Sequence, residues 1–142
     1  MAQSVTITTR YRAADSDVVR ITIDWTSHTD GTVTQALPKA YSGYLERVVF
    51  NPGSTAPTNL YDVTLTDEQS FDVLHGQGAN LSDTNTTDVS PGVPLKDGTT
   101  TSVTKCLIDD VLTLNITNAG SSKTGAVVLY IRLFGDLGHQ AL

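Results

Sequence analysis

The chain has 142 residues, a mass of 15.1 kDa and a net charge of −6, with 39% hydrophobic and only 17% charged residues. Threonine replaces much of the missing charge, as in residues 84–87 and 99–101. Since β-branched threonine beside valine and isoleucine suits a pleated sheet better than a helix, the composition disfavours a helical bundle, a coiled coil, a disordered chain and, less firmly, an ordinary enzyme.

Alternation of apolar and polar residues predicts strands in the first third of the chain. Residues 5–9 form a first strand, and residues 19–25 form a second one with a clearly buried face. The dipeptide Asp30-Gly31 has the chemistry of a tight hairpin turn, after which residues 32–36 are expected to return as a shorter strand.

The middle of the chain predicts two further strands separated by a turn. Residues 44–50 alternate less and are expected to touch apolar surface on both sides. Residues 51–54, Asn-Pro-Gly-Ser, predict a type II turn in which Gly53 takes the positive φ. Residues 60–66 alternate again, with three inward side chains: Tyr61, Val63 and Leu65.

A long segment with little periodicity follows. Residues 71–74 are a short apolar piece that fits either a strand or one helical turn. Residues 76–101 are too long for an ordinary connection, so we interpret them as a functional or docking loop with a brief strand at residues 93–95.

The last third predicts three strands. Residues 103–108 and 111–117 are strands on either side of Asp109-Asp110. Residues 126–134 are apolar on both faces, which predicts a central strand or one covered by a partner.

These elements predict an all-β fold with little or no helix. Seven to nine short strands with frequent turns are typical of a two-sheet β-sandwich, jelly-roll-like and with long loops. We expect one domain over residues 1–142, with residues 1–3 and 135–142 as loose or partner-bound tails. The spacing leaves open whether the connections are those of a jelly roll or of an immunoglobulin-like fold.

Charge and hydropathy patterns disfavour two classes of partner. The basic residues are scattered singly, whereas binding to nucleic acid requires clustered lysine and arginine. No apolar run approaches the roughly 20 residues of a membrane span, and the N-terminus lacks the pattern of a secretory signal. We therefore expect no nucleic-acid partner, no membrane partner and synthesis in a cytoplasm.

No pattern for catalysis, a cofactor or a metal is visible. Cys106 stands in an apolar stretch and is expected to be a buried small hydrophobe. His28, His75 and His139 lack the spacing of a zinc site. Nucleophile-elbow and dinucleotide motifs are absent or incomplete, and the turn carboxylates are expected to cap the chain rather than bind calcium.

The remaining chemistry is that of an interaction protein. Tyr41, Tyr44 and Arg47 cluster around a glycine, and the long loop offers apolar groups among prolines, at Val89, Val93 and Leu95. Aromatic, arginine and apolar side chains of this kind suit docking to a protein surface. The equally weighted alternative is that they fold back onto the core of their own chain.

Residues 51–68, which contain Tyr-Asp-Val-Thr-Leu, and residues 71–82, which begin Phe-Asp-Val-Leu-His-Gly, resemble small structural proteins of tailed bacteriophages, most of all the head decoration (cement) proteins. The resemblance implies a jelly-roll or related β fold, a homodimer or homotrimer, and a position on the outer surface of the capsid. There the protein would bridge major capsid proteins. The resemblance implies no catalytic residue.

Three alternatives remain for the function. A phage tail or baseplate component would share the β-rich composition. A carbohydrate-binding module would use Tyr41, Tyr44 or Trp25 as a stacking platform, although aromatic residues are scarce. An enzyme, the least favoured class, would rely on Asp109 and Asp110.

Overall fold

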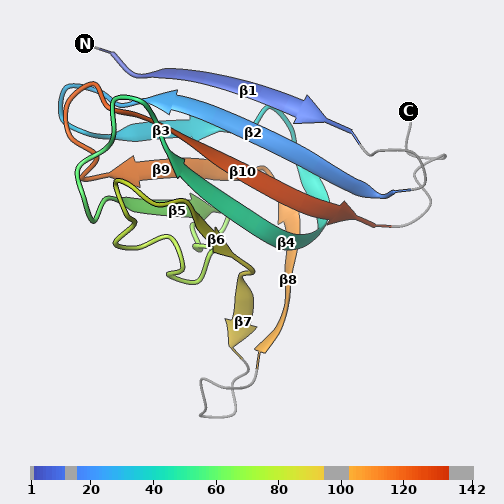
Figure 1. Ribbon diagram of the computed structural model, residues 1–142. Coiled ribbons are helices and arrows are strands. Elements are labelled where there is room, and N and C mark those ends of the chain that lie inside the picture. Colours follow the sequence, from blue (N-terminus) through green and yellow to red (C-terminus); the bar gives the residue numbers. More distant parts are fainter. Residues whose placement is uncertain (1, 12–15, 95–102, 135–142) are drawn as a thin grey trace.

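The computed structural model describes residues 2–11, 16–94 and 103–134. Ten strands form a seven-stranded and a three-stranded sheet, and the described residues contain no helix (Figure 1). The predicted all-β sandwich is therefore confirmed. The described residues contain one more strand than the upper end of the expected range, because the long loop contains two short strands rather than one.

All strand pairs are antiparallel. The larger sheet contains, in spatial order, β1 (Ser4–Arg10), β2 (Val18–Thr26), β10 (Thr124–Leu133), β4 (Tyr41–Pro52), β8 (Val103–Asp110) and β7 (Gly92–Pro94), with β6 (Thr87–Val89) also paired to β4. The smaller sheet contains β3 (Val33–Ala36), β9 (Thr113–Thr117) and β5 (Asp62–Thr66).

The connections are those of a jelly roll. The chain changes sheet at every step from β2 to β5 and again from β8 to β10, so that the strands β2-β10-β4-β8 belong to one layer and β3-β9-β5 to the other. Beside β5, turns take the place of a further strand, and isolated bridges join Tyr61 to Leu81 and Thr66 to Asp72.

The hairpin predicted at Asp30-Gly31 is wrong. The turn is present, with Gly31 at φ 85° and its N–H donating to the His28 carbonyl at 3.0 Å. The strands on either side nevertheless pair in different sheets. Ser27 explains the change of direction: it is fully buried, and its N–H donates to the Lys123 carbonyl at 2.8 Å, so the chain leaves β2 at a fixed corner.

The type II turn predicted at residues 51–54 is also wrong. β4 continues through Pro52, and the glycines at positive φ are elsewhere in the described chain. The N–H of Gly53 donates to the Thr124 carbonyl at 2.9 Å, and a Cβ at this position would lie 2.2 Å from the Thr124 Oγ1. A side chain is thus excluded by the close approach of two chain segments, not by backbone conformation.

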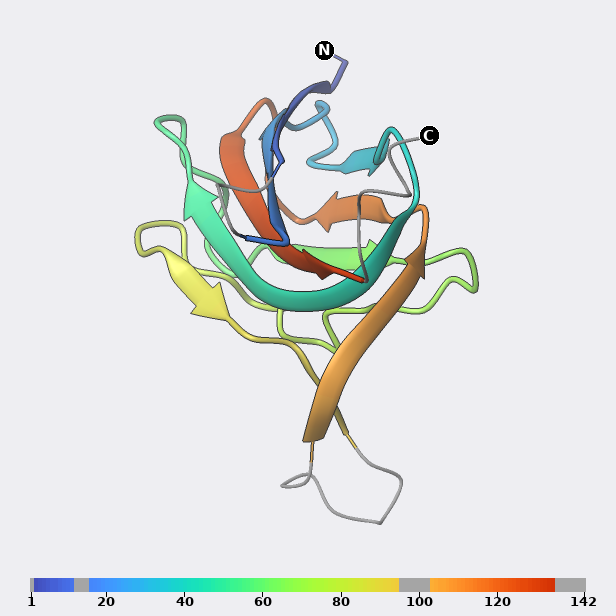
Figure 2. The ribbon, with the colours of Figure 1, turned by 90° about the vertical axis from the view of Figure 1, so that its right-hand side faces the viewer.

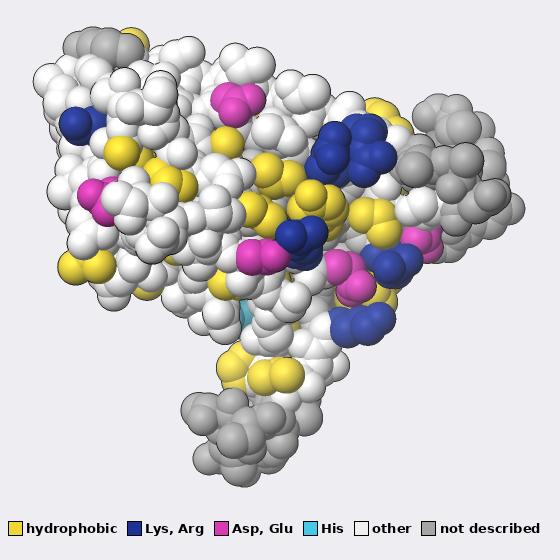
Figure 3. Space-filling model, in the orientation of Figure 1, with side chains coloured by type: hydrophobic (Ala, Val, Ile, Leu, Met, Phe, Trp, Pro, Cys, Tyr) yellow, Lys and Arg dark blue, Asp and Glu magenta, His cyan; other side chains and the backbone are white. Residues whose placement is uncertain are grey.

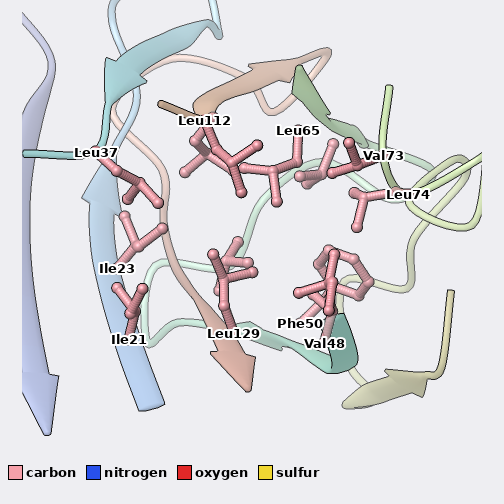
Figure 4. Packing of buried hydrophobic residues seen from close by; sticks show 14 of the residues in the cluster. Ile21, Ile23, Leu37, Val48, Phe50, Leu65, Val73, Leu74, Leu112 and Leu129 are labelled. Carbon is pink, nitrogen blue, oxygen red and sulfur yellow. The ribbon is translucent and has the colours of Figure 1, made fainter. Parts of the chain in front are cut away.

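The core lies between the two sheets. Every second residue of β2 is buried, from Val19 to Trp25, as the alternation predicted. Figure 4 shows Ile21, Ile23 and Leu129 of the larger sheet pointing toward side chains of the opposite layer. β10 pairs with β2 on one side and β4 on the other, which confirms the central strand expected from its apolar faces.

A β-bulge interrupts the alternation of β4. Ile131 of β10 pairs with Leu45 and Tyr130 pairs with Arg47, which leaves Glu46 as the extra residue. Leu45 and Val48 are consequently both buried although they are three residues apart. This bulge accounts for the weak periodicity of the sequence there.

Candidate protein-interaction surface

The bulge in β4 brings two of the predicted interface residues to the same face of the sheet. Tyr44 lies before Glu46 and Arg47 after it, and both point away from the core because the extra residue reverses the alternation. Tyr44 pairs with Leu107 of β8, and Arg47 pairs with Tyr130 of β10. We call these four outward residues, Tyr44, Arg47, Leu107 and Tyr130, the outer patch.

Arg47 is held in place from two sides. Its Nη2 donates to the Oδ2 of Asp88 at 2.7 Å and its Nε donates to Oδ1 at 3.0 Å. The guanidinium carbon lies 5.1 Å from the centroid of the Tyr130 ring, a cation–π distance. The hydrogen bond from Arg47 lowers the pKa of Asp88 below its ordinary value, so this carboxylate stays charged. The arginine is therefore oriented while half of its side chain remains exposed.

The other half of the outer patch is aromatic and apolar. The Tyr44 ring meets the Phe134 ring edge to face, with the centroids 5.0 Å apart, and the Lys105 Nζ lies 5.0 Å from the Tyr44 centroid. Leu107 is 59% exposed, more than any other large hydrophobic side chain of the described chain. Figure 3 shows hydrophobic side chains gathered on this face with basic and acidic groups beside them.

β8 and β7 extend this surface away from the body. Gly92, Val93 and Pro94 pair with the first residues of β8, which reaches beyond the two layers (Figures 1 and 2). Val103 at its start is 58% exposed. We call β7 and the paired residues 103–105 of β8 the arm. An open hollow of about 560 Å³ lies between the arm and β4, lined by residues 45–46, 90–92 and 103–105. A two-stranded ribbon of this kind is only marginally stable by itself in water.

The other predicted interface residues lie differently. Tyr41 is 3% exposed, and its burial raises the pKa of its hydroxyl; it belongs to the core and not to the outer patch. Val89 and Val93 are half-buried and pack against the core, as the alternative prediction had it for loop residues. Leu95 lies outside the described residues.

Two residues of the outer patch, Leu107 and Tyr130, are not among the interface residues predicted from the sequence, although the sequence contains a signal for each. Leu107 stands between Cys106 and Ile108, both buried, so alternation alone directs it outward. Tyr130 stands between two buried residues of a strand whose outer face had been expected to need cover.

Two titratable side chains outside the patch, Asp72 and Cys106, cap and pack the chain. The Oδ1 of Asp72 accepts from the N–H groups of Leu65 and Leu74, and its Oδ2 accepts from Gly76. Cys106 is buried as predicted, and this burial raises the pKa of its thiol to about 11. In residues 2–11, 16–94 and 103–134, no three side chains of His, Cys, Asp or Glu come together as a metal site requires.

Two aromatic residues considered for carbohydrate stacking are not on the surface. Trp25 is 2% exposed and packs at a tilt against Tyr61, with the ring centroids 5.9 Å apart, and Tyr41 is also buried. Only Tyr44 of that set faces outward. The described part of the chain also contains no helix long and apolar enough to cross a membrane.

Comparison with models of known protein families found no family that matches this chain, and comparison with curated proteins found no relative.

Proposed function

We propose that the protein is a non-catalytic structural part of a tailed-phage virion: a decoration protein that binds the outside of the head and bridges neighbouring major capsid proteins. The resemblance of residues 51–82 to such proteins supports the class of function. The observation that carries the proposal is the outer patch, in which an exposed leucine lies on the same sheet face as an arginine held by its neighbours.

The chemistry of the outer patch suits a protein partner. Tyrosine and arginine are enriched among the residues that contribute most to protein–protein binding, and Leu107 supplies apolar area that a partner can cover. Because Asp88 and Tyr130 already orient Arg47, binding orders this side chain at little further cost in entropy.

The proposed mechanism is mass action. A protein that binds the expanded capsid lattice and not the unexpanded one stabilises the expanded state by its binding free energy. Where one molecule touches two capsid subunits, the second contact forms at a high effective concentration, so that weak contacts add up. The shell is thereby strengthened against the pressure of the packaged DNA.

The experiment mixes the purified protein with expanded and with unexpanded heads of the phage that encodes it, and measures bound protein and the heat resistance of the heads. We expect binding to expanded heads and higher heat resistance. Leu107→Asp should weaken binding about tenfold or more, because it places a charge in the desolvated contact. Leu60→Asp is the matched control, since Leu60 is 55% exposed and lies outside the outer patch.

Each outcome decides a different part of the proposal. Absence of binding to both kinds of head, or binding without a gain in heat resistance, overturns the decoration function. Equal loss of binding in the two leucine variants overturns the assignment of the outer patch. Binding to purified tails in place of heads moves the protein to the tail or baseplate and overturns the position on the capsid.

A further inference from the structure

β1 forms an open edge of the seven-stranded sheet. It pairs with β2 over its whole length, from Ser4 opposite Thr26 to Arg10 opposite Arg20. Along its other side, no main-chain group of the described residues forms a hydrogen bond with it (Figure 1). Within the described residues, the outward N–H and C=O groups of this strand, about half of its total, are therefore open to another strand.

This edge lacks most of the features that normally prevent strand-to-strand association. Its sequence, Ser-Val-Thr-Ile-Thr-Thr-Arg, contains no proline, glycine or lysine, and its pairing with β2 has no bulge. The opposite edge, β7, has three residues and includes Pro94. The edge strand β3 has four residues. Natural proteins protect their edges by shortness, proline, charged side chains or bulges, and of these β1 has only the charge of Arg10, at its last position.

We propose that β1 pairs antiparallel with β1 of a second copy of this chain, about a two-fold axis at Ile7. Residues opposite each other in an antiparallel pair point to the same face of the sheet. The two-fold axis must therefore place one residue opposite its own copy, and not opposite the copy of its neighbour in the chain, which points to the other face. An axis at Ile7, the middle of the seven-residue strand, pairs all seven residues.

This register is self-complementary. Thr6 lies opposite Thr8 of the second copy and Val5 opposite Thr9, pairings of β-branched residues that stabilise sheets. The only charged residue of the strand, Arg10, lies opposite Ser4 and not opposite another arginine. Val5 and Ile7 point to the core side and are only half-buried in the single chain, and the second copy adds cover to both.

The dimer has a consequence for the outer patch. A two-fold axis perpendicular to the sheet keeps the outer faces of the two copies on the same side of the joined sheet. The outer patch lies on β4, β8 and β10, on the far side of β2 from the joined edge, so pairing leaves it uncovered. The dimer then presents two patches in one direction, which suits the bridging of two sites on one partner surface. The pairing itself does not depend on the proposed function.

The test is the mass of the full chain in solution, measured by sedimentation equilibrium over a range of concentrations. We expect a dimer with twice the chain mass of 15.1 kDa. The double variant T6K/T8K places lysine opposite lysine at two points of the pairing and should weaken the dimer at least tenfold. The double variant T6K/T8E places lysine opposite glutamate at the same two points and should retain the dimer.

Both variants change the same two exposed threonines, so they are matched in position and number of substitutions. Circular dichroism and thermal unfolding at low concentration verify that each variant folds. A monomer at the highest soluble concentration of the unmodified chain overturns the proposal, and so does a trimer. Equal dimerisation of the two variants overturns the pairing at Ile7, because only that register places position 6 opposite position 8. None of these outcomes bears on binding to phage heads.

Discussion

Arg47 and Asp88 form a two-point ion pair between the middle of β4 and the short strand β6. The Nε and Nη2 of the arginine donate to the two carboxylate oxygens at 3.0 and 2.7 Å. The pair joins the segment between β5 and β7 to the larger sheet and holds the guanidinium over the Tyr130 ring. One interaction thus fixes both a chain segment and the orientation of a surface cation.

Asp88→Ala should separate these two roles. Because both side chains are about half exposed, the pair contributes little to stability, and we expect an almost unchanged unfolding temperature. Binding to the partner should fall, since Arg47 loses the group that orients it. Thermal unfolding and binding to expanded heads measure the two effects. Asp83→Ala, in the same connection, is the control; a similar loss of binding in both variants contradicts the orienting role.

Gly125 is required by the packing of Trp25. A Cβ at position 125 would lie 2.5 Å from the Cζ2 and 2.8 Å from the Cε2 of the indole ring. Gly125→Ala should therefore cost about 1–3 kcal/mol of unfolding free energy, as overpacking of a core does. In a Trp25→Phe background the same change should cost less, because the smaller phenyl ring has no counterpart of the indole Cζ2, the atom closest to the added Cβ. Urea unfolding of the four proteins in the cycle measures the difference, and additive effects would contradict this explanation.

Ser27 fixes the corner between the two sheets. Its Oγ donates to the Gly120 carbonyl at 2.6 Å and accepts from the Lys123 N–H at 2.9 Å, and the residue is fully buried. Ser27→Ala removes two hydrogen bonds to the part-buried Gly120 carbonyl and Lys123 N–H and should lower the unfolding free energy by about 1–3 kcal/mol. Ser42→Ala removes an exposed hydroxyl that bonds Asp109 and should cost much less, because water replaces it. Equal costs in urea unfolding are the contrary result.

The sequence predicted the fold where one local property decides the outcome. Alternation placed Trp25 in the core, and apolar character on both faces placed β10 between two strands. The connection from β2 to β3 was not predictable in this way. Its turn residues are those of a hairpin, but the buried Ser27 bonds the chain to a turn more than ninety residues away, which no local pattern records.

The same limit applies to the outer patch. Simple alternation places Tyr44 and Arg47 on opposite faces of a strand, and only the bulge at Glu46 brings them together. Tyr41 is buried, since it lies on the inward side before the bulge. Aromatic and arginine residues identified the region, but the pairing with β10 decides which of them face outward.

Because of Cys106, the free energy of unfolding should decrease as the pH rises through the alkaline range. Burial raises the pKa of its thiol to about 11, and the charges of Asp67 and Asp72 act in the same direction. An unfolded cysteine titrates near about 8.5. Because the folded pKa is the higher one, the stabilisation is complete below the unfolded value and is lost as the pH rises toward the folded value.

Urea unfolding at pH 8 and at pH 10, with a reductant present, tests this for the unmodified chain and for Cys106→Ala. The unmodified chain should lose about 1–2 kcal/mol more unfolding free energy over this interval than the variant. Tyr61, whose pKa burial raises to about 12, is present in both proteins, so its contribution cancels in the comparison. Equal losses in the two proteins would mean that the thiol ionises in the folded chain as easily as in the unfolded one, which would contradict its buried position on the core side of β8.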